Sequence, residues 1–196
     1  MVKKVKTFFS KRAKIWDKIH KPCDFSTALK ISLIPKNTQR KTVLDVGCGT
    51  GIMLPFLIAR FKKVFACDIS PEMVKIARKK YPLAEIYTID FEKKHFFPHN
   101  FFDVVIIYNA FPHFAGPLSA CYEAFRILKN GGLLIISHSL IRKEINRIHK
   151  KAGKAVEKDL LPDDNAFKII LSNSGFRNIT IREEEDFIIT AIKKYN

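Results

Sequence analysis

The amino-acid sequence predicts a doubly wound α/β fold, in which helices cover both faces of a mostly parallel sheet. From residue 42 onward, short apolar runs alternate with helical patterns, as the successive βα units of such a fold require. Runs such as 104–107 and 133–136 are apolar at every position, which is typical of strands buried on both faces. A glycine-rich loop, 47–51, follows the first strand, and open sheets of this class bind ligands at such strand ends.

The first 41 residues are predicted to form a helical cap that precedes the sheet. A helix over residues 4–20 ends before Pro22, because proline lacks the N–H that would continue the helix. A second, short helix over 25–34 ends before Pro35 for the same reason.

The central part of the chain is predicted to hold five strands and three helices in alternation. Each expected strand is a short run of β-branched, aromatic or aliphatic residues, and one helix begins with Pro71, a favoured first-turn residue. The strands are expected at 42–47, 63–68, 85–89, 102–108 and 132–138, and the helices at 51–61, 71–80 and 117–129.

The last quarter of the chain is predicted to add two helices and a hairpin. A basic helix is expected near 142–153, and a second helix over 163–174 ends at Gly175, which can take the left-handed conformation of a helix terminus. Strands at 176–182 and 186–193 then pair as an antiparallel hairpin, which brings the expected sheet to seven strands.

Length and composition indicate one globular domain of 196 residues with 47% hydrophobic residues. We expect a cap at 1–41, a ligand-binding core at 42–140, and a basic helix with the hairpin at 141–196. No apolar run approaches the ~18 residues of a membrane helix, and no signal peptide is expected. The four cysteines show no zinc or redox spacing, so we expect reduced thiols, no metal and a cytoplasmic location.

The formal net charge of +16 is unevenly distributed along the chain. Residues 1–42 carry twelve Lys and Arg against two acids, and residues 142–158 carry seven against two. Such segments favour anionic partners, namely nucleic acid, acidic lipid or an anionic metabolite. Solvated helix faces would have the same composition, and both interpretations stay open at this point.

The motif Val-Leu-Asp-Val-Gly-Cys-Gly-Thr-Gly over 43–51 is the most informative segment. Its glycines let the backbone approach a ligand closely, and Asp68 closes the next strand, where doubly wound folds place the acid that binds ribose hydroxyls. The dehydrogenase fingerprint would require glycine at Ile52. Asp45, just before the glycines, is awkward beside a pyrophosphate but suits a ligand that carries an ammonium group.

This ordered set resembles the class I, Rossmann-like S-adenosylmethionine-dependent methyltransferases of the methyltransferase domain 11/25 type, best over residues 40–140. The resemblance implies S-adenosyl-L-methionine as methyl donor and methyl transfer by in-line displacement. It implies donor contacts from the strand-end residues Asp45, Gly47, Cys48, Gly49, Gly51, Asp68, Ile69, Met73, Asp90, Phe91, Asn109 and Ala110. Among them, Asp68 would accept from the ribose and Asp90 from the adenine amino group, while Asn109 and Ala110 would lie beneath the methionine.

Three histidines and an asparagine are the candidates for catalytic residues at the acceptor end. His113 lies in the loop after the fourth strand and His138 ends the fifth, so both are expected at the same crevice. Asn146 and His149 are three residues apart and share one helix face. We expect all four in one pocket, with one of them as a general base if the acceptor must lose a proton. A histidine bonded to loop backbone, or a solvated basic helix, is the alternative.

Three functional hypotheses follow. The first is a methyltransferase for a small-molecule acceptor, anionic or aromatic, with the loop phenylalanines of 96–114 beside it. The second is an rRNA or tRNA methyltransferase, which the isoelectric point of about 9.8 favours. Against it, no Asn-Pro-Pro-Tyr segment follows the fourth strand. The third is a non-catalytic protein that keeps the fold as a nucleoside-binding scaffold.

Overall fold

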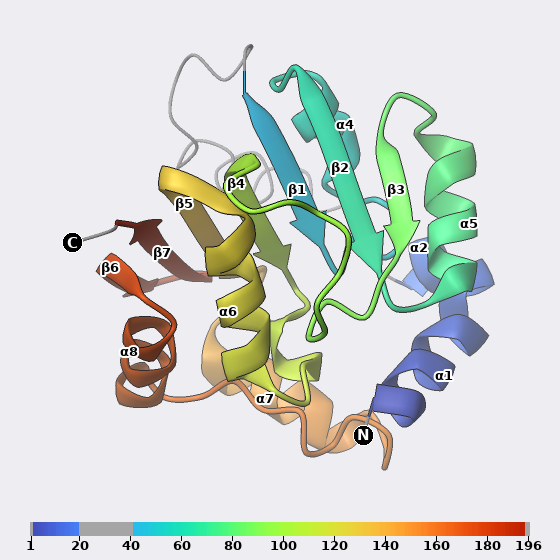
Figure 1. Cartoon of the computed structure of the whole chain (residues 1–196). Helices are drawn as coiled ribbons and strands as arrows, with labels where there is room; N and C mark the ends of the chain where they lie inside the picture. The colour runs from blue at the N-terminus through green and yellow to red at the C-terminus, as the bar shows by residue number, and fades with distance from the viewer. Residues whose placement is uncertain (1, 20–40, 195–196) are drawn as a thin grey trace.

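The computed structural model describes residues 2–19 and 41–194 and contains a seven-stranded sheet with the order β3-β2-β1-β4-β5-β7-β6 (Figure 1). All neighbouring strands are parallel except at β7, which is antiparallel to both β5 and β6. The strands are β1 Thr42–Val46, β2 Lys63–Asp68, β3 Glu85–Thr88, β4 Phe102–Tyr108, β5 Leu128–His138, β6 Phe176–Glu183 and β7 Phe187–Lys193. The predicted fold class, a doubly wound and mostly parallel sheet with a terminal hairpin, is confirmed.

Helices cover both faces of this sheet. The helices after β1 are α4 Leu54–Ile58, α5 Pro71–Lys80, α6 Pro117–Ile127, α7 Arg142–Lys151 and α8 Asp164–Asn173. Side chains alternate between the faces of a strand, so Leu44 joins the core beneath α6 and α8 while Val43 joins the core beneath α4 and α5. The central strands are therefore apolar throughout because each face packs against its own helices.

The N-terminal segment is helical over α1 Val2–Arg12, the 3₁₀ turn η1 Ala13–Ile15 and α2 Trp16–Ile19. It lies at the carboxyl ends of the parallel strands, on the side to which the arrows of β1 and β2 point (Figure 1). This agrees with the predicted cap, while the predicted helix over 25–34 and Cys23 lie outside the described residues. Within 2–19 and 41–194, no helix has the length and apolarity needed to cross a bilayer.

Two elements differ from their expected bounds by three or more residues at one or both ends. The helix expected at 51–61 is only α4, because Gly51 has φ +92° and the chain turns until Leu54, where the helix begins with Pro55 in its first turn. Strand β5 begins at Leu128, four residues before the expected start, although Asn-Gly-Gly follows at once. The ladder with β4 accommodates these residues as an irregularity, since Leu128 pairs with Phe102 before the register shifts.

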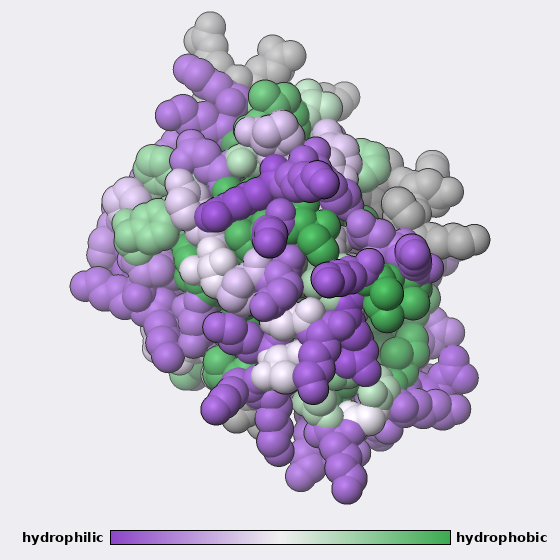
Figure 2. All heavy atoms as spheres, turned by 90° about the vertical axis from the view of Figure 1, so that its right-hand side faces the viewer, coloured by the Kyte–Doolittle hydropathy of each residue, from purple (hydrophilic) through white to green (hydrophobic). Residues whose placement is uncertain are grey.

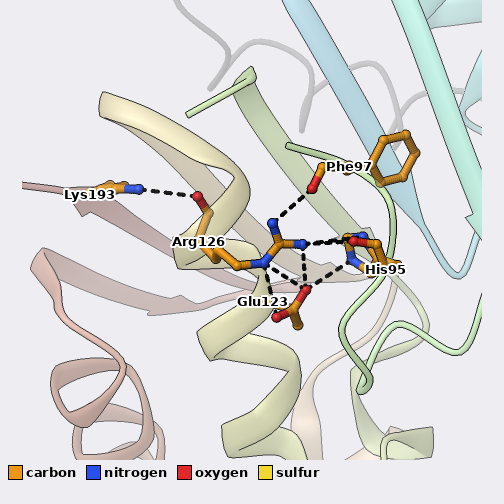
Figure 3. A network of polar contacts seen from close by, with 5 residues as sticks. All are labelled: His95, Phe97, Glu123, Arg126 and Lys193. Atoms are coloured by element: carbon orange, nitrogen blue, oxygen red, sulfur yellow. Dashed lines mark hydrogen bonds and ion pairs between the residues drawn. The ribbon is translucent and has the colours of Figure 1, made fainter. Parts of the chain in front are cut away.

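A polar network fixes the carboxyl end of α6 to the loop before β4 and to β7 (Figure 3). The guanidinium of Arg126 pairs with Glu123 at 2.7 Å and donates to the backbone oxygen of Phe97 at 2.8 Å. Lys193, fully buried, donates from Nζ to the backbone oxygen of Phe125 at 2.6 Å and to Oδ1 of Asn100 at 2.9 Å. A buried cation thus satisfies the carbonyl groups that the end of α6 leaves without helical partners.

Replacing this buried cation tests the network. Lys193→Met keeps most of the volume but removes the hydrogen bonds that Nζ donates to the carbonyl of Phe125 and to the amide oxygen of Asn100. We expect a loss of about 1–3 kcal/mol in the free energy of unfolding, measured by urea denaturation. The matched control is Lys194→Met, at an exposed position, which is expected to change stability by less than about 0.5 kcal/mol. Equal effects of the two substitutions would contradict the assignment.

Candidate functional site

A cavity of about 300 Å³ lies at the carboxyl ends of β1, β2, β4 and β5. Further walls come from α1, the start of α2 and α7, and both α1 and α7 lie below the strand ends in Figure 1. The volume is within the range of small-molecule sites, and the position is the one where open α/β sheets bind ligands. The cap expected from the sequence therefore forms part of the site.

The glycine loop forms the floor of this cavity, but its three glycines do different things. Gly47 has φ +72°, and a Cβ there would lie 2.5 Å from Cβ of Ala110, so the loop can approach the β4 loop only with glycine. Gly49 has φ +54° and faces the cavity, with Nε1 of Trp16 3.8 Å from its Cβ position. Gly51 does not line the cavity; a Cβ there would meet Tyr81. Gly51 therefore has a packing role in the structure, while its contact with a ligand stays a prediction.

Asp68, at the end of β2, lines the cavity and holds two backbone segments together. Its Oδ2 accepts from the N–H of Gly49 at 2.9 Å, and its Oδ1 accepts from the N–H of Ser70 at 2.8 Å. Burial raises the pKa of Asp68, and these two hydrogen bonds oppose the rise. Each carboxylate oxygen keeps acceptor capacity for a further donor in the cavity.

Asp45 is fully buried in β1 and does not line the cavity. Its Oδ2 has no hydrogen-bond partner among residues 2–19 and 41–194. Burial, together with the charge of nearby Asp68, raises the pKa of Asp45 to about 7. The expected direct contact between Asp45 and a ligand is not provided by this arrangement, because the acid lies behind the cavity wall.

One end of the cavity combines apolar and acidic side chains. Ile69, Met73 and Phe91 line it together with Asp90 and Glu92. One carboxylate oxygen of Asp90 lies 3.3 Å from Nζ of Lys93, while its Oδ1 is buried without a hydrogen-bond partner in the described chain. This end can thus hold a flat ring on apolar groups while an acid accepts a hydrogen bond from it.

The β4 and β5 loops meet at the opposite end. Asn109 has φ +51°, a conformation that asparagine tolerates better than most residues, and it joins the two loops. Its Oδ1 accepts from the N–H of Ser139 at 3.0 Å. Ala110 packs against Gly47, and His138 and Cys48 complete this part of the lining. Four residues that were singled out from the sequence therefore lie on the cavity wall, namely Cys48, Asn109, Ala110 and His138.

His113 and His149 lie side by side in the lining, with ring centroids 4.9 Å apart. Nδ1 of His113 is 2.9 Å from Oδ2 of Asp159, a buried acid in the segment between α7 and α8. Asn146 does not line the cavity, contrary to the prediction. Its side chain instead pairs with both backbone groups of Leu161, at 2.8 and 3.4 Å.

The sequence did not identify Asp159. It lies forty-six positions from His113, in a segment without regular secondary structure, and an acid in a connection normally indicates only a turn or a solvated side chain. No spacing rule joins it to the histidine, and only the tertiary packing brings the two together.

The N-terminal cap is attached to the glycine loop and to α5 by polar contacts. Asp17 accepts from the hydroxyl of Thr50 at 2.5 Å and pairs with Lys80 at 2.9 Å. The hydroxyls of Ser10 and Ser70 are 3.0 Å apart. Because of these contacts, Val5, Phe9 and Trp16 lie over the cavity as one of its walls.

The charge of the cavity contrasts with that of the surface. Its described lining contains acids and histidines but no Lys or Arg. The described Lys and Arg residues lie outside the cavity, and the face formed by α1 and α5 is covered largely by hydrophilic side chains (Figure 2). Among the residues that the structure describes, no group of three or more His, Cys, Asp or Glu is arranged to hold a metal ion.

Comparison with known proteins gives consistent matches. The profile of the methyltransferase domain family matches residues 44–136. The chain is 35% identical over 122 residues to demethylmenaquinone methyltransferase of Chlorobaculum parvum, covering 61% of this chain and 49% of that protein. It is 31% identical over 104 residues to ubiquinone biosynthesis O-methyltransferase of Nitrosomonas europaea, covering 50% of this chain and 44% of that protein. The chain thus spans about half the length of the curated relatives it matches.

A solved structure matches along almost the whole chain. It belongs to the complex between the Haloferax volcanii Trm112 methyltransferase activator and a methyltransferase, with a TM-score of 0.80, 20% identity and 98% of each chain covered. At this identity the likeness concerns the fold, including the helical segment before β1.

The raised pKa of Asp45 gives a test of the site's electrostatics. Since its pKa is about 7 in the folded chain and 3.8 without burial, the folded state holds the proton more tightly. The contribution of Asp45 to stability therefore falls as pH rises from about 4 to 7 and is constant above. Asp45→Asn removes this loss, so we expect it to raise the free energy of unfolding by about 2–4 kcal/mol at pH 8 and by little at pH 4.

Asp103→Asn serves as the control of opposite sign. Burial acts to raise the pKa of Asp103, but hydrogen bonds from Lys129 and Thr42 outweigh it, so the pKa is lowered. That acid stabilises the fold above its unfolded pKa, and its replacement should destabilise the chain at pH 8. Urea denaturation at the two pH values measures both variants. A stability difference between Asp45→Asn and the parent that does not change with pH would contradict the buried-acid assignment.

Proposed function

Because the profile of the methyltransferase domain family matches residues 44–136, we propose that the chain is an S-adenosylmethionine-dependent methyltransferase with a small-molecule acceptor. The observation that carries the proposal is Asp68, which binds the N–H of Gly49 while facing a cavity of ligand size. An acid at this strand end is suited to accept hydrogen bonds from a ribose.

The residues of the cavity fit this donor better than a dinucleotide. A pyrophosphate would require positive charge or free N–H groups, but the described lining has no Lys or Arg and Asp68 occupies the N–H of Gly49. S-adenosylmethionine is a nucleoside without phosphate that carries a positively charged sulfonium and an ammonium. Acids at Asp68, Asp90 and Glu92 are compatible with such a ligand.

Each part of the wall then has a defined role toward the donor. Asp68 accepts from the ribose hydroxyls, while Ile69 and Met73 pack on the adenine. Asp90 accepts from the adenine amino group, and the backbone beside Phe91 completes that end. Gly47, Cys48, Gly49, Asn109 and Ala110 line the methionine part, and S-adenosylmethionine supplies the methyl group in activated form when it is bound.

The acceptor is proposed to lie between the cap and α7. That part of the wall consists of apolar and aromatic side chains, among them Phe9, Phe114, Ile145 and Ile148. The two curated relatives are named for quinone compounds, which supports an apolar ring as acceptor. The protein's tasks in the transfer are to align the acceptor with the methyl group and to exclude water, and the cap serves both.

Replacing Asp68 tests the donor site. We expect the parent chain to bind S-adenosylhomocysteine with about micromolar affinity and NAD⁺ much more weakly. Asp68→Ala removes the ribose acceptor, so affinity should fall by about 1.5–3 kcal/mol, roughly tenfold to a hundredfold, in calorimetry. Glu85→Ala, at the start of β3 and the far end of the sheet, is the control and should bind like the parent.

Thermal unfolding of the Asp68 variant shows whether it is folded under the conditions of the titration. Undiminished binding by a folded Asp68→Ala chain would contradict the site, and NAD⁺ binding of equal strength would contradict the donor.

A further inference from the structure

The segment between α7 and α8 brings a buried acid to a cavity histidine. Asp159 is only 5% exposed, and its Oδ2 lies 2.9 Å from Nδ1 of His113. A carboxylate can only accept in this contact, so Nδ1 of His113 carries the hydrogen and Nε2 keeps its lone pair. This is the arrangement in which an acid fixes the tautomer and orientation of a histidine base.

Residues of α7 hold the acid in place. Nδ1 of His149 donates to the backbone oxygen of Asp159, and the side chain of Asn146 pairs with both backbone groups of Leu161. The segment 159–161 is therefore fixed at two points by one helix face. Because Asn146 and His149 lie three residues apart on α7, both can bond to the segment 159–161, although Asn146 does not line the cavity.

The surroundings of His149 favour its neutral form. Burial lowers the pKa of His149, and the charge of His113 lowers it further, against the opposing effect of its bond to Asp159. His149 therefore stays neutral in the neutral pH range. Of the two histidines, His113 is the one whose ring nitrogen lies within hydrogen-bond distance of a carboxylate, that of Asp159.

The surroundings restrict what can reach His113. The ring of Phe9 meets its imidazole edge to face, with centroids 4.9 Å apart, and Phe114, Ile145 and Ile148 complete an apolar wall. Because no Lys or Arg lines the described cavity, an acceptor that arrives as an anion finds no fixed positive charge. An uncharged aromatic ring whose hydroxyl can lose a proton is compatible with both the wall and the base.

We propose that His113 is a general base, positioned by Asp159, that deprotonates the hydroxyl of a neutral phenolic acceptor. The O–H bond breaks, its electron pair stays on the acceptor oxygen, and the proton forms a bond to Nε2 of His113. The imidazolium is neutralised by Asp159, and the phenolate oxygen is the nucleophile toward the methyl group. The inference rests on the proposed function, whose acceptor class it specifies.

The test uses 4-nitrophenol, because its phenolate form absorbs at longer wavelength than its neutral form. The full chain is titrated with this phenol below the pKa of the free compound, with and without S-adenosylhomocysteine. We expect the parent to bind it with the phenolate spectrum. His113→Asn and Asp159→Asn should reduce the phenolate fraction about tenfold or more. His99→Asn, an exposed histidine, is the matched control and should behave like the parent.

Two results would overturn the assignment. The first is a parent chain that binds S-adenosylhomocysteine but leaves 4-nitrophenol unbound or neutral, and the second is a phenolate spectrum that survives in His113→Asn. If Asp159→Asn does not fold, the His113 variant decides. If the chain ionises the phenol but does not bind S-adenosylhomocysteine, the result supports His113 as the base and contradicts the proposed methyl donor. The proposal for the base and the proposal for the donor can therefore fail separately.

Discussion

The carboxylate of Asp68 is the interaction on which the rest of the site depends. One oxygen binds the glycine loop through Gly49, and the other binds Ser70, whose hydroxyl caps α5 by accepting from the N–H of Met73 at 3.2 Å. The same hydroxyl is 3.0 Å from that of Ser10 in the cap. One acid at the end of β2 therefore sets the loop, the start of a helix and, through Ser70, the position of the wall above the cavity.

This arrangement concentrates negative charge where burial opposes it. Asp45 and Asp68 are both buried, burial raises the pKa of each, and the charge of Asp68 contributes to the shift of Asp45. Such a pair is unfavourable in the free protein unless a positive charge comes close. The cationic nucleoside proposed as ligand would bring such a charge to acids that have no Lys or Arg beside them in the described lining.

The limits of the sequence prediction follow from particular residues. The strands were predictable because each central run is apolar on both faces, and β2 and β4 have the expected bounds. The floor of the site was predictable because the strand, the glycine loop and Asp68 follow one another closely in the sequence. Asp159 was not, since its partner His113 is reached only through the packing of α7 on the β4 loop. Asn146 shares a helix face with His149 as predicted, but its side chain bonds to the backbone of Leu161 and does not line the cavity.

The net charge of the chain describes its surface and not the lining of the cavity. The described Lys and Arg residues lie outside the cavity lining, so they do not determine what the cavity binds. The central claim is that the cavity holds an adenosyl ligand by its ribose at Asp68. A crystal structure with S-adenosylhomocysteine tests it most directly. The account predicts ribose hydroxyls within hydrogen-bond distance of Asp68 and the adenine against Ile69 and Met73. A ligand bound elsewhere, or one in this cavity whose ribose lies away from Asp68, would contradict the account.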